Sequence, residues 1–218
     1  MQCVVKEKPQ VQFEPVTSSA QQIGIMGGTF NPIHLAHLYI AYEAKEQLNL
    51  DKVIFMPAGN PPHKKNTIID AKFRYEMVRK AIEGYEGFEI NSYEIEKNGY
   101  SYTYETLNAL KEDDLKLYFI AGADSLMDIE KWKNTKEVLN SCTFVVFNRG
   151  EFNRETLKSQ KEYLENKYQA EIVLLDIMSI DISSTIIRKR IKEGKRVDFF
   201  LPNKVLEYIN DNEFYRGD

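Results

Sequence analysis

The stretch GGTFNPIHLAH, residues 27–37, decides the fold of this chain because it joins a first strand to a first helix. Before it, the apolar run 23–26 indicates a short buried strand, and after it Leu35, Leu38 and Ala41 recur at helical spacing. A glycine pair at such a turn lets the backbone approach a ligand closely, and the helix that follows offers N–H groups and a dipole that favour an anion. The stretch therefore predicts a phosphate-binding corner made of strand, loop and helix.

Two histidines, His34 and His37, stand three residues apart at the start of this helix. Side chains at that spacing share one helical face, so both imidazoles can donate hydrogen bonds to the same phosphate. In another setting the pair would indicate only an ordinary helix start with two partly exposed side chains. The strand and the glycine turn before them favour the phosphate site.

Strand-like and helical patterns alternate along the chain. We expect strands near residues 23–27, 52–57, 88–95, 116–121, 142–147 and 171–175. We expect helices at 35–48, 71–84, 102–111, 154–168, 183–194 and 203–210. This order predicts an α/β, Rossmann-like, doubly wound parallel sheet with helices on both faces, which binds ligands at the carboxyl ends of its strands.

The chain has 218 residues, of which 43% are hydrophobic, enough to bury one substantial core. We therefore expect a single domain over residues 23–218. Residues 1–22 are polar, contain Pro9 and Pro15, and lack the continuous apolar segment of a secretory signal. They are interpreted as a flexible N-terminal extension.

The net charge of −4 argues against a protein that binds long nucleic acid, although a local pocket for small phosphorylated ligands stays possible. No apolar stretch approaches the roughly 20 residues that cross a bilayer, so we expect no membrane partner. The two cysteines, Cys3 and Cys142, suggest neither a disulfide framework nor a metal site and are consistent with a cytoplasmic protein. A homo-oligomer remains open.

GGTFNPIHLAHL resembles the GGTFDPxHxGH motif of the nucleotidylyltransferase superfamily. Two positions depart from that motif: Asn31 stands where Asp is common, and Ala36 stands where the second motif glycine is expected. Asn31 keeps a short polar side chain that can hold the turn. Ala36 adds one methyl group near the phosphates but leaves both histidines in place.

A second motif, DISSTIIR at residues 181–188, places Ser183, Ser184 and Thr185 at the start of a helix. Arg188 lies four residues beyond Ser184 and therefore on the same face, which makes a second possible anion site. By itself this pattern also fits an N-capped amphipathic helix. Together with the first motif it resembles ISSTxIR, the triphosphate-binding element of the same superfamily.

Three further segments resemble bacterial nicotinate mononucleotide adenylyltransferases: PPHK ending at Lys64, SYT ending at Thr103, and KW ending at Trp132. The resemblance implies that Thr103 contacts the nicotinate carboxylate, that Trp132 stacks on the ring, and that Lys64 supplies an assisting charge. Read without it, the three segments fit a solvated turn, a helix cap at Ser101, and core packing.

Four other residues join the candidate site. Gly122 and Asp124 follow a central strand, and Asp124 could accept hydrogen bonds from ribose hydroxyls or cap the next helix. Arg149 could hold a mononucleotide phosphate with two hydrogen bonds, or be an ordinary loop charge. Arg74 at the start of the helix at 71–84 is either an exposed charge, the more common case, or an inward anchor for the same mononucleotide.

The resemblance covers the chain from about residue 23 onward and implies one reaction of NAD biosynthesis: ATP and nicotinate mononucleotide give deamido-NAD and pyrophosphate by direct in-line transfer. It implies Mg²⁺ as a cofactor that bridges phosphates. The implied catalytic residues are His34, His37, Lys64 and Arg188. The implied ATP-binding residues are Gly27, Gly28, Thr29, Phe30, His34, His37, Gly122, Asp124, Ser183, Ser184, Thr185 and Arg188. The implied nicotinate mononucleotide-binding residues are Lys64, Arg74, Thr103, Trp132 and Arg149.

Two alternatives stay open. Another member of the superfamily, such as a pantetheine-phosphate adenylyltransferase or a cytidylyltransferase, would share the phosphate motifs and take a different acceptor. A catalytically idle nucleotide-binding regulator is also compatible, and the departures at Asn31 and Ala36 favour it slightly. A tRNA synthetase is disfavoured because no KMSKS-like loop or anticodon-binding region fits within this length.

Overall fold

The computed structural model describes residues 20–60, 69–97 and 99–217. Six parallel strands form one sheet in the order β3-β2-β1-β4-β5-β6. The strands are β1 (Gln21–Gly28), β2 (Lys52–Pro57), β3 (Phe88–Ile90), β4 (Leu115–Gly122), β5 (Thr143–Phe147) and β6 (Glu171–Leu174). The chain thus runs outward from β1 in one direction and, after β4, outward in the other. The predicted doubly wound parallel sheet is confirmed.

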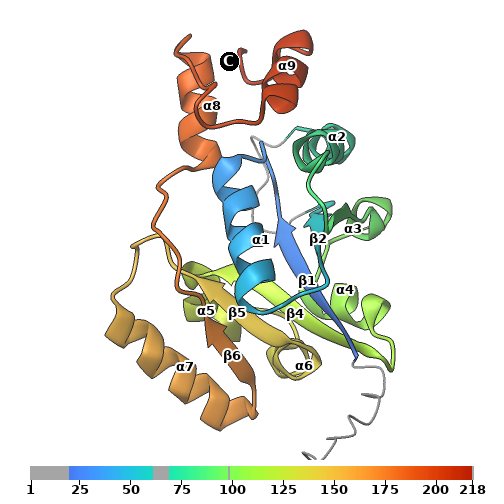
Figure 1. Ribbon diagram of the computed structural model, residues 1–218, viewed down its shortest axis with the longest axis vertical. Coiled ribbons are helices and arrows are strands. Elements are labelled where there is room, and N and C mark those ends of the chain that lie inside the picture. The colour runs from blue at the N-terminus through green and yellow to red at the C-terminus, as the bar shows by residue number, and fades with distance from the viewer. Residues whose placement is uncertain (1–19, 61–68, 98, 218) are drawn as a thin grey trace, which may run out of the picture.

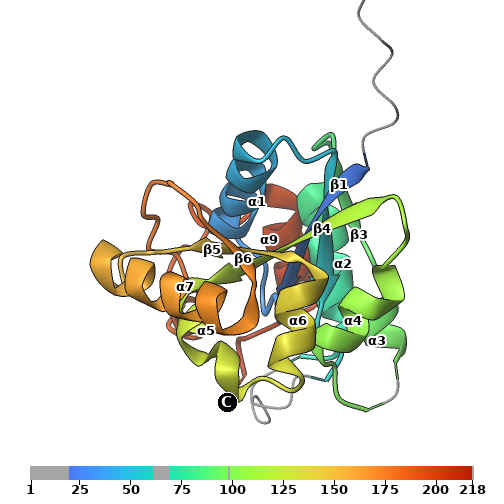
Figure 2. The same cartoon turned by 90° about the horizontal axis from the view of Figure 1, so that it is seen from below.

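Helices cover both faces of this sheet, with α1 on one side and α5 and α6 on the other (Figures 1 and 2). The longer helices are α1 (Leu35–Gln47), α2 (Ala71–Ile82), α4 (Thr103–Leu110), α7 (Arg154–Tyr168), α8 (Ser184–Lys192) and α9 (Asn203–Asp211). The shorter ones are α3 (Tyr93–Glu96), α5 (Ala123–Asp128), the 3-10 turn η1 (Ile129–Lys131) and α6 (Thr135–Ser141). Within the described ranges, no helix is both long and apolar enough to cross a membrane.

The core has two parts because neighbouring side chains of a strand point to opposite faces of the sheet. In β4, Phe119 packs with α4–α7 on one face, whereas Ile120 packs with α1, α2, α8 and α9 on the other. Phe144 and Val145 of β5 divide in the same way. Both faces being buried explains why the strands read as continuous apolar runs.

The sheet has its switch point between β1 and β4, where the winding direction reverses. The carboxyl ends of these two strands diverge into loops on opposite faces, which opens a crevice between them. The α8 and α9 helices lie beyond the carboxyl end of β1 (Figure 1). The fold thus brings the loop after the first strand and the last helices of the chain to the same edge of the sheet.

Three expectations about the elements need correction. The strand predicted at 88–95 ends at Ile90, because the Asn91 side chain accepts a hydrogen bond from the Tyr93 N–H (2.8 Å) and α3 begins there. The short helices α5 and α6 were not predicted. The first strand begins at Gln21 rather than residue 23, which shortens the predicted extension of 1–22; residues 1–19 lie outside the described part of the chain.

Candidate functional site

A cavity of 270 Å³ opens at the switch point, between the carboxyl ends of β1 and β4. The predicted phosphate site and the predicted pyridine-ring site both contribute residues to its wall. The lining residues include Gly27, Gly28, His37, Glu94, Thr103, Phe119, Gly122, Ser125, Trp132 and Phe147. Part of the predicted phosphate site, Gly27, Gly28 and His37, therefore shares one cavity with the predicted pyridine-ring residues Thr103 and Trp132.

The two histidines stack on one another at the start of α1, with ring centroids 3.7 Å apart. The backbone N–H of His34 donates a hydrogen bond to Nδ1 of His37 (3.2 Å). Because Nδ1 accepts this bond, a neutral His37 carries its proton on Nε2 and can donate it. The ring of Phe30 packs edge-on against His37 at 5.1 Å and is itself buried, so it fixes the orientation of that imidazole.

The side chain of His34 is 2% exposed, and its Nδ1 atom is buried without a hydrogen-bond partner among the described residues. Burial, with a smaller contribution from the charge of Arg149, lowers the pKa of His34 to about 3. Hence His34 is a neutral imidazole at physiological pH. It can donate or accept a hydrogen bond to a phosphate but does not bring a positive charge.

The second predicted motif reaches the first one directly. Ser184 Oγ donates a hydrogen bond to the Pro32 carbonyl (2.8 Å), and Arg188 Nη1 donates to the Asn31 carbonyl (2.8 Å). The contacting residues are more than 150 positions apart in sequence, and the expected convergence of the two motifs is confirmed. A guanidinium has five N–H donors, so Arg188 retains donors for a phosphate.

The hydroxyls around Ser184 have separate functions at the start of α8. Ser183 is the N-cap, and its Oγ accepts a hydrogen bond from the Ile186 N–H (3.3 Å). Thr185 Oγ1 lies 3.4 Å from Arg188 Nη2 and helps to orient that guanidinium. The N-terminus of α8 therefore faces the loop that follows β1, as the sequence predicts.

Arg74 corrects the expectation that its side chain is an exposed helix charge. Its side chain is 1% exposed, and it donates hydrogen bonds to the carbonyls of Thr29 (2.7 Å), Gly59 (3.0 Å) and Ile69 (3.0 Å). Burial lowers its pKa, but the three carbonyls supply partners for the charge. Arg74 is thus an inward anchor and not an exposed helix charge, while its contact with a mononucleotide stays a prediction. It joins the loops that follow β1 and β2.

Two of the predicted acceptor residues, Thr103 and Trp132, line the cavity. Trp132 is half-buried and packs edge-on against Phe119 and Phe144, with ring centroids 6.1 Å and 6.2 Å away. Thr103 is the first residue of α4, and Tyr102 rather than Ser101 occupies the N-cap position. Trp132 therefore packs against core aromatic rings and also lines the cavity.

Four predicted site residues remain: Gly122, Asp124, Arg149 and Lys64. Asp124 is exposed in the first turn of α5, and its carboxylate lies where a Cβ at residue 122 would be, which explains why Gly122 is required there. Arg149 is half-buried, 3.5 Å from Glu151, and its charge acts on His34. Asp124 and Arg149 do not line the cavity. Lys64 lies outside the described residues.

One cavity residue, Glu94, was missed by the sequence analysis. Thr106 Oγ1 donates a hydrogen bond to its Oε1 atom (2.7 Å), and burial raises the pKa of this carboxyl. Glu94 falls in the stretch predicted as a strand, where no pattern distinguished it from the neighbouring Glu96. Its place in the wall follows from the unpredicted helix α3.

Comparisons with known proteins define the class first. Residues 25–190 match the family described as cytidylyltransferase-like, so the predicted phosphate-binding site lies within a nucleotidyltransferase fold. The structure is similar to Plasmodium falciparum nicotinic acid mononucleotide adenylyltransferase complexed with NaAD, with a TM-score of 0.75 over 91% of this chain and 98% of that chain. The sequence identity is 19%, so this likeness concerns the fold.

Closer relatives define the family within that class. The chain is 56% identical over 197 residues to a protein of Clostridium botulinum, covering 90% of this chain and 98% of the relative. It is 50% identical over 203 residues to a protein of Clostridium beijerinckii, covering 90% and 100%. Both carry the name "probable nicotinate-nucleotide adenylyltransferase". The chain belongs to the nicotinate-nucleotide adenylyltransferase family, which confirms the resemblance found in the sequence.

Replacing Arg74 tests whether its three carbonyl contacts stabilise the fold. We expect Arg74→Met to lower the free energy of unfolding by about 3 kcal/mol, because buried carbonyls lose charged donors. Urea denaturation measures the change. Arg79→Met is the matched control on the same helix, since Arg79 is exposed and paired only with Glu76; its effect should stay within about 0.5 kcal/mol. Equal effects of the two substitutions would contradict the structural role of Arg74.

The lowered pKa of His34 has a consequence for stability in acid. As pH falls below 6.5, His34 becomes protonated in the unfolded chain while it stays neutral in the folded one, so protons favour unfolding. Between pH 7 and about pH 5, we expect the unfolding free energy of the unaltered protein to fall about 2 kcal/mol more than that of His34→Gln. Denaturation at both pH values measures the difference, and parallel losses in the two proteins would show that His34 titrates normally.

Proposed function

We propose that this chain transfers the adenylyl group of ATP to nicotinate mononucleotide, giving deamido-NAD and releasing pyrophosphate, as its family membership indicates. One observation carries the proposal: three residues of the first motif border the same cavity as Thr103 and Trp132, namely Gly27, Gly28 and His37. A transfer between two nucleotides needs both of them side by side, because most of the catalytic effect in phosphoryl-type transfers comes from positioning. The alternative of an idle nucleotide-binding regulator predicts no release of pyrophosphate.

In the proposed reaction, the phosphate of the mononucleotide attacks the α-phosphorus of ATP in line and displaces pyrophosphate, without a covalent enzyme intermediate. The Nε2–H group of His37 donates a hydrogen bond to the α-phosphate oxygens, and neutral His34 donates another. Negative charge increases on these oxygens in the transition state, so both bonds stabilise it. The burial of His34 supports this assignment because a neutral donor needs no desolvation of a charge. The N-terminus of α1 adds its dipole at the same place.

The β- and γ-phosphates are assigned to the N-terminus of α8, with Ser184, Thr185 and the remaining donors of Arg188. Lys64 is proposed to add an assisting charge. Among the described residues, no group of three His, Cys, Asp or Glu side chains is placed to hold a metal ion. Mg²⁺ is therefore proposed to be bound mainly through phosphate oxygens and water, as is usual for this ion with nucleotides.

The acceptor nucleotide is assigned to the wall formed by Thr103 and Trp132. The flat indole of Trp132 can stack on the electron-poor pyridine ring, and Thr103 can donate to the ring carboxylate from the first turn of α4. Arg149, whose charge reaches His34, is proposed to neutralise the mononucleotide phosphate. Asp124 and Gly122 are assigned to the ATP ribose side.

Removing the imidazole of His37 tests the proposed phosphate chemistry. We expect His37→Ala to lower kcat at least about 100-fold with ATP, Mg²⁺ and nicotinate mononucleotide, because a donor to the transition state is lost. We expect the same of His34→Ala. Pyrophosphate release measures the rate, and Arg79→Met serves as an unaffected surface variant. Unchanged turnover in either histidine variant would remove that residue from the mechanism.

Thr103 tests how the acceptor is selected. We expect Thr103→Val to lower kcat/KM for nicotinate mononucleotide about tenfold, because a hydrogen bond to a charged group is lost. With nicotinamide mononucleotide, which has no ring carboxylate, the change should stay below about threefold. Initial rates with both acceptors at fixed ATP and Mg²⁺ measure the effect. An equal loss with both acceptors would contradict a contact with the carboxylate.

A further inference from the structure

The loop from Thr29 to Pro32 is held by a fourth side chain that the proposed mechanism does not use. Tyr215 Oη donates a hydrogen bond to Oδ1 of Asn31 (2.9 Å) across 184 residues of sequence. The backbone of Tyr215 has φ 65°, a left-handed conformation that side chains rarely adopt. Tyr215 comes from the segment that follows α9, so the loop after the first strand is in contact with the last described residues.

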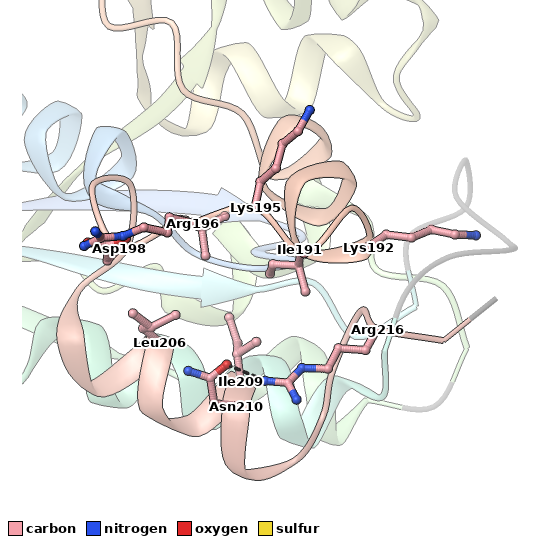
Figure 3. Close-up of a pocket in the computed structure, with 11 residues that line it drawn as sticks. Ile191, Lys192, Lys195, Arg196, Asp198, Leu206, Ile209, Asn210 and Arg216 are labelled. Carbon is pink, nitrogen blue, oxygen red and sulfur yellow. Dashed lines mark hydrogen bonds and ion pairs between the residues drawn. The ribbon is translucent and has the colours of Figure 1, made fainter.

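Neighbouring contacts hold the segment that carries Tyr215. Phe214 packs against Phe73 of α2 and Tyr208 of α9, with ring centroids 5.0 Å and 5.9 Å away. On the other side, Arg216 Nη2 donates to Asn210 Oδ1 of α9 (2.8 Å), as Figure 3 shows. These contacts fix the backbone on both sides of Tyr215, so its hydroxyl is held in position rather than carried on a loose chain end.

Figure 3 also shows the cleft between α8 and α9, of 540 Å³, which Arg216 borders. Although it is larger than the cavity at the switch point, it does not have the character of an anion site. Lys195 and Arg196 at its rim form ion pairs with Glu193 and Asp198. Among the described residues, this cleft therefore matters because Arg216, which borders it, helps to hold the segment that carries Tyr215.

Two groups of Asn31, its backbone carbonyl and its side-chain oxygen, accept hydrogen bonds. Its carbonyl accepts from Arg188 Nη1 (2.8 Å), and its side chain accepts from Tyr215. Asn31 precedes Pro32 and is three residues from His34, where α1 begins. The contacts that hold Asn31 thus set the direction in which the chain enters α1, whose N-cap is His34 and whose first turn contains His37.

We propose that Tyr215 is a positioning residue for adenylyl transfer: its hydroxyl holds Asn31 and, through Asn31, the loop that places His34 and His37. The inference rests on the proposed function of these histidines. Burial raises the pKa of Tyr215 above its usual range, so the hydroxyl stays protonated and remains a donor. A looser loop would disturb the transition state more than the binding of either nucleotide, because catalysis depends on positions within about 0.5 Å.

The matched test compares two tyrosines of the same aromatic cluster. Tyr215→Phe removes only the hydroxyl that donates to Asn31, whereas Tyr208→Phe removes a hydroxyl that makes no contact with the loop. We expect Tyr215→Phe to lower kcat roughly three- to tenfold, the range for one neutral hydrogen bond, with both KM values changed less than about twofold. We expect Tyr208→Phe to keep the kcat of the unaltered protein. Pyrophosphate release and the melting temperature are measured for each protein.

A cycle of variants at Asn31 separates positioning from general stability. Asn31→Leu removes the acceptor, so adding Tyr215→Phe should cause no further loss of kcat. Asn31→Asp keeps an acceptor, and there the loss from Tyr215→Phe should reappear. An unchanged kcat in Tyr215→Phe, or the same loss in the Asn31→Leu background, overturns the inference. If the unaltered protein releases no pyrophosphate, the proposed function itself fails, which is a distinct result.

Discussion

The structure depends on how the carbonyl oxygens of one loop are satisfied. The loop after β1 cannot use a sheet or a helix for this purpose, and buried carbonyls without partners are costly. Side chains from α2 and α8 supply the donors: Arg74 binds Thr29, Arg188 binds Asn31, and Ser184 binds Pro32. Side-chain donors rather than a regular secondary structure therefore hold this loop in its conformation.

The same contacts explain why α8 and the segment after α9 lie beside the first strand. In a doubly wound sheet, β1 is central and its carboxyl end opens at the switch point. Elements from the end of the chain cross to this edge and pack on the same face as α1 and α2. The proposed substrate binding and the tertiary packing are consequently linked, because Arg188 and Ser184 hold the loop and are also assigned to the phosphates.

Periodicity and the two motifs predicted the parts of this protein whose signals are local. The bounds of β2 and α7 agree with the sequence prediction, and the start of α8 differs from it by one residue. The expectation that the two phosphate motifs meet came from their resemblance to elements of one superfamily, and the alternation of strands and helices predicted the sheet itself. Hydrophobic patterning predicted these strands and helices because both faces of a parallel sheet must be covered.

The misses concern properties that sequence neighbours do not determine. Arg74 stands where a helix usually exposes its charge, and only the three carbonyls from distant loops make its burial favourable. The helices α5 and α6 have six and seven residues, too few turns for a helical period to be distinguished from noise. Glu94 became a wall residue because a single side chain, Asn91, ended the strand before it.

The contact between Asn31 and Tyr215 also has a consequence for the timing of biosynthesis. The 184 positions that separate them take roughly 10–40 s to translate at about 5–20 residues per second. During that interval the nascent chain already contains both imidazoles but lacks the tyrosine that braces their loop. The contact that Tyr215 makes with this loop is therefore completed long after the two histidines have been synthesised.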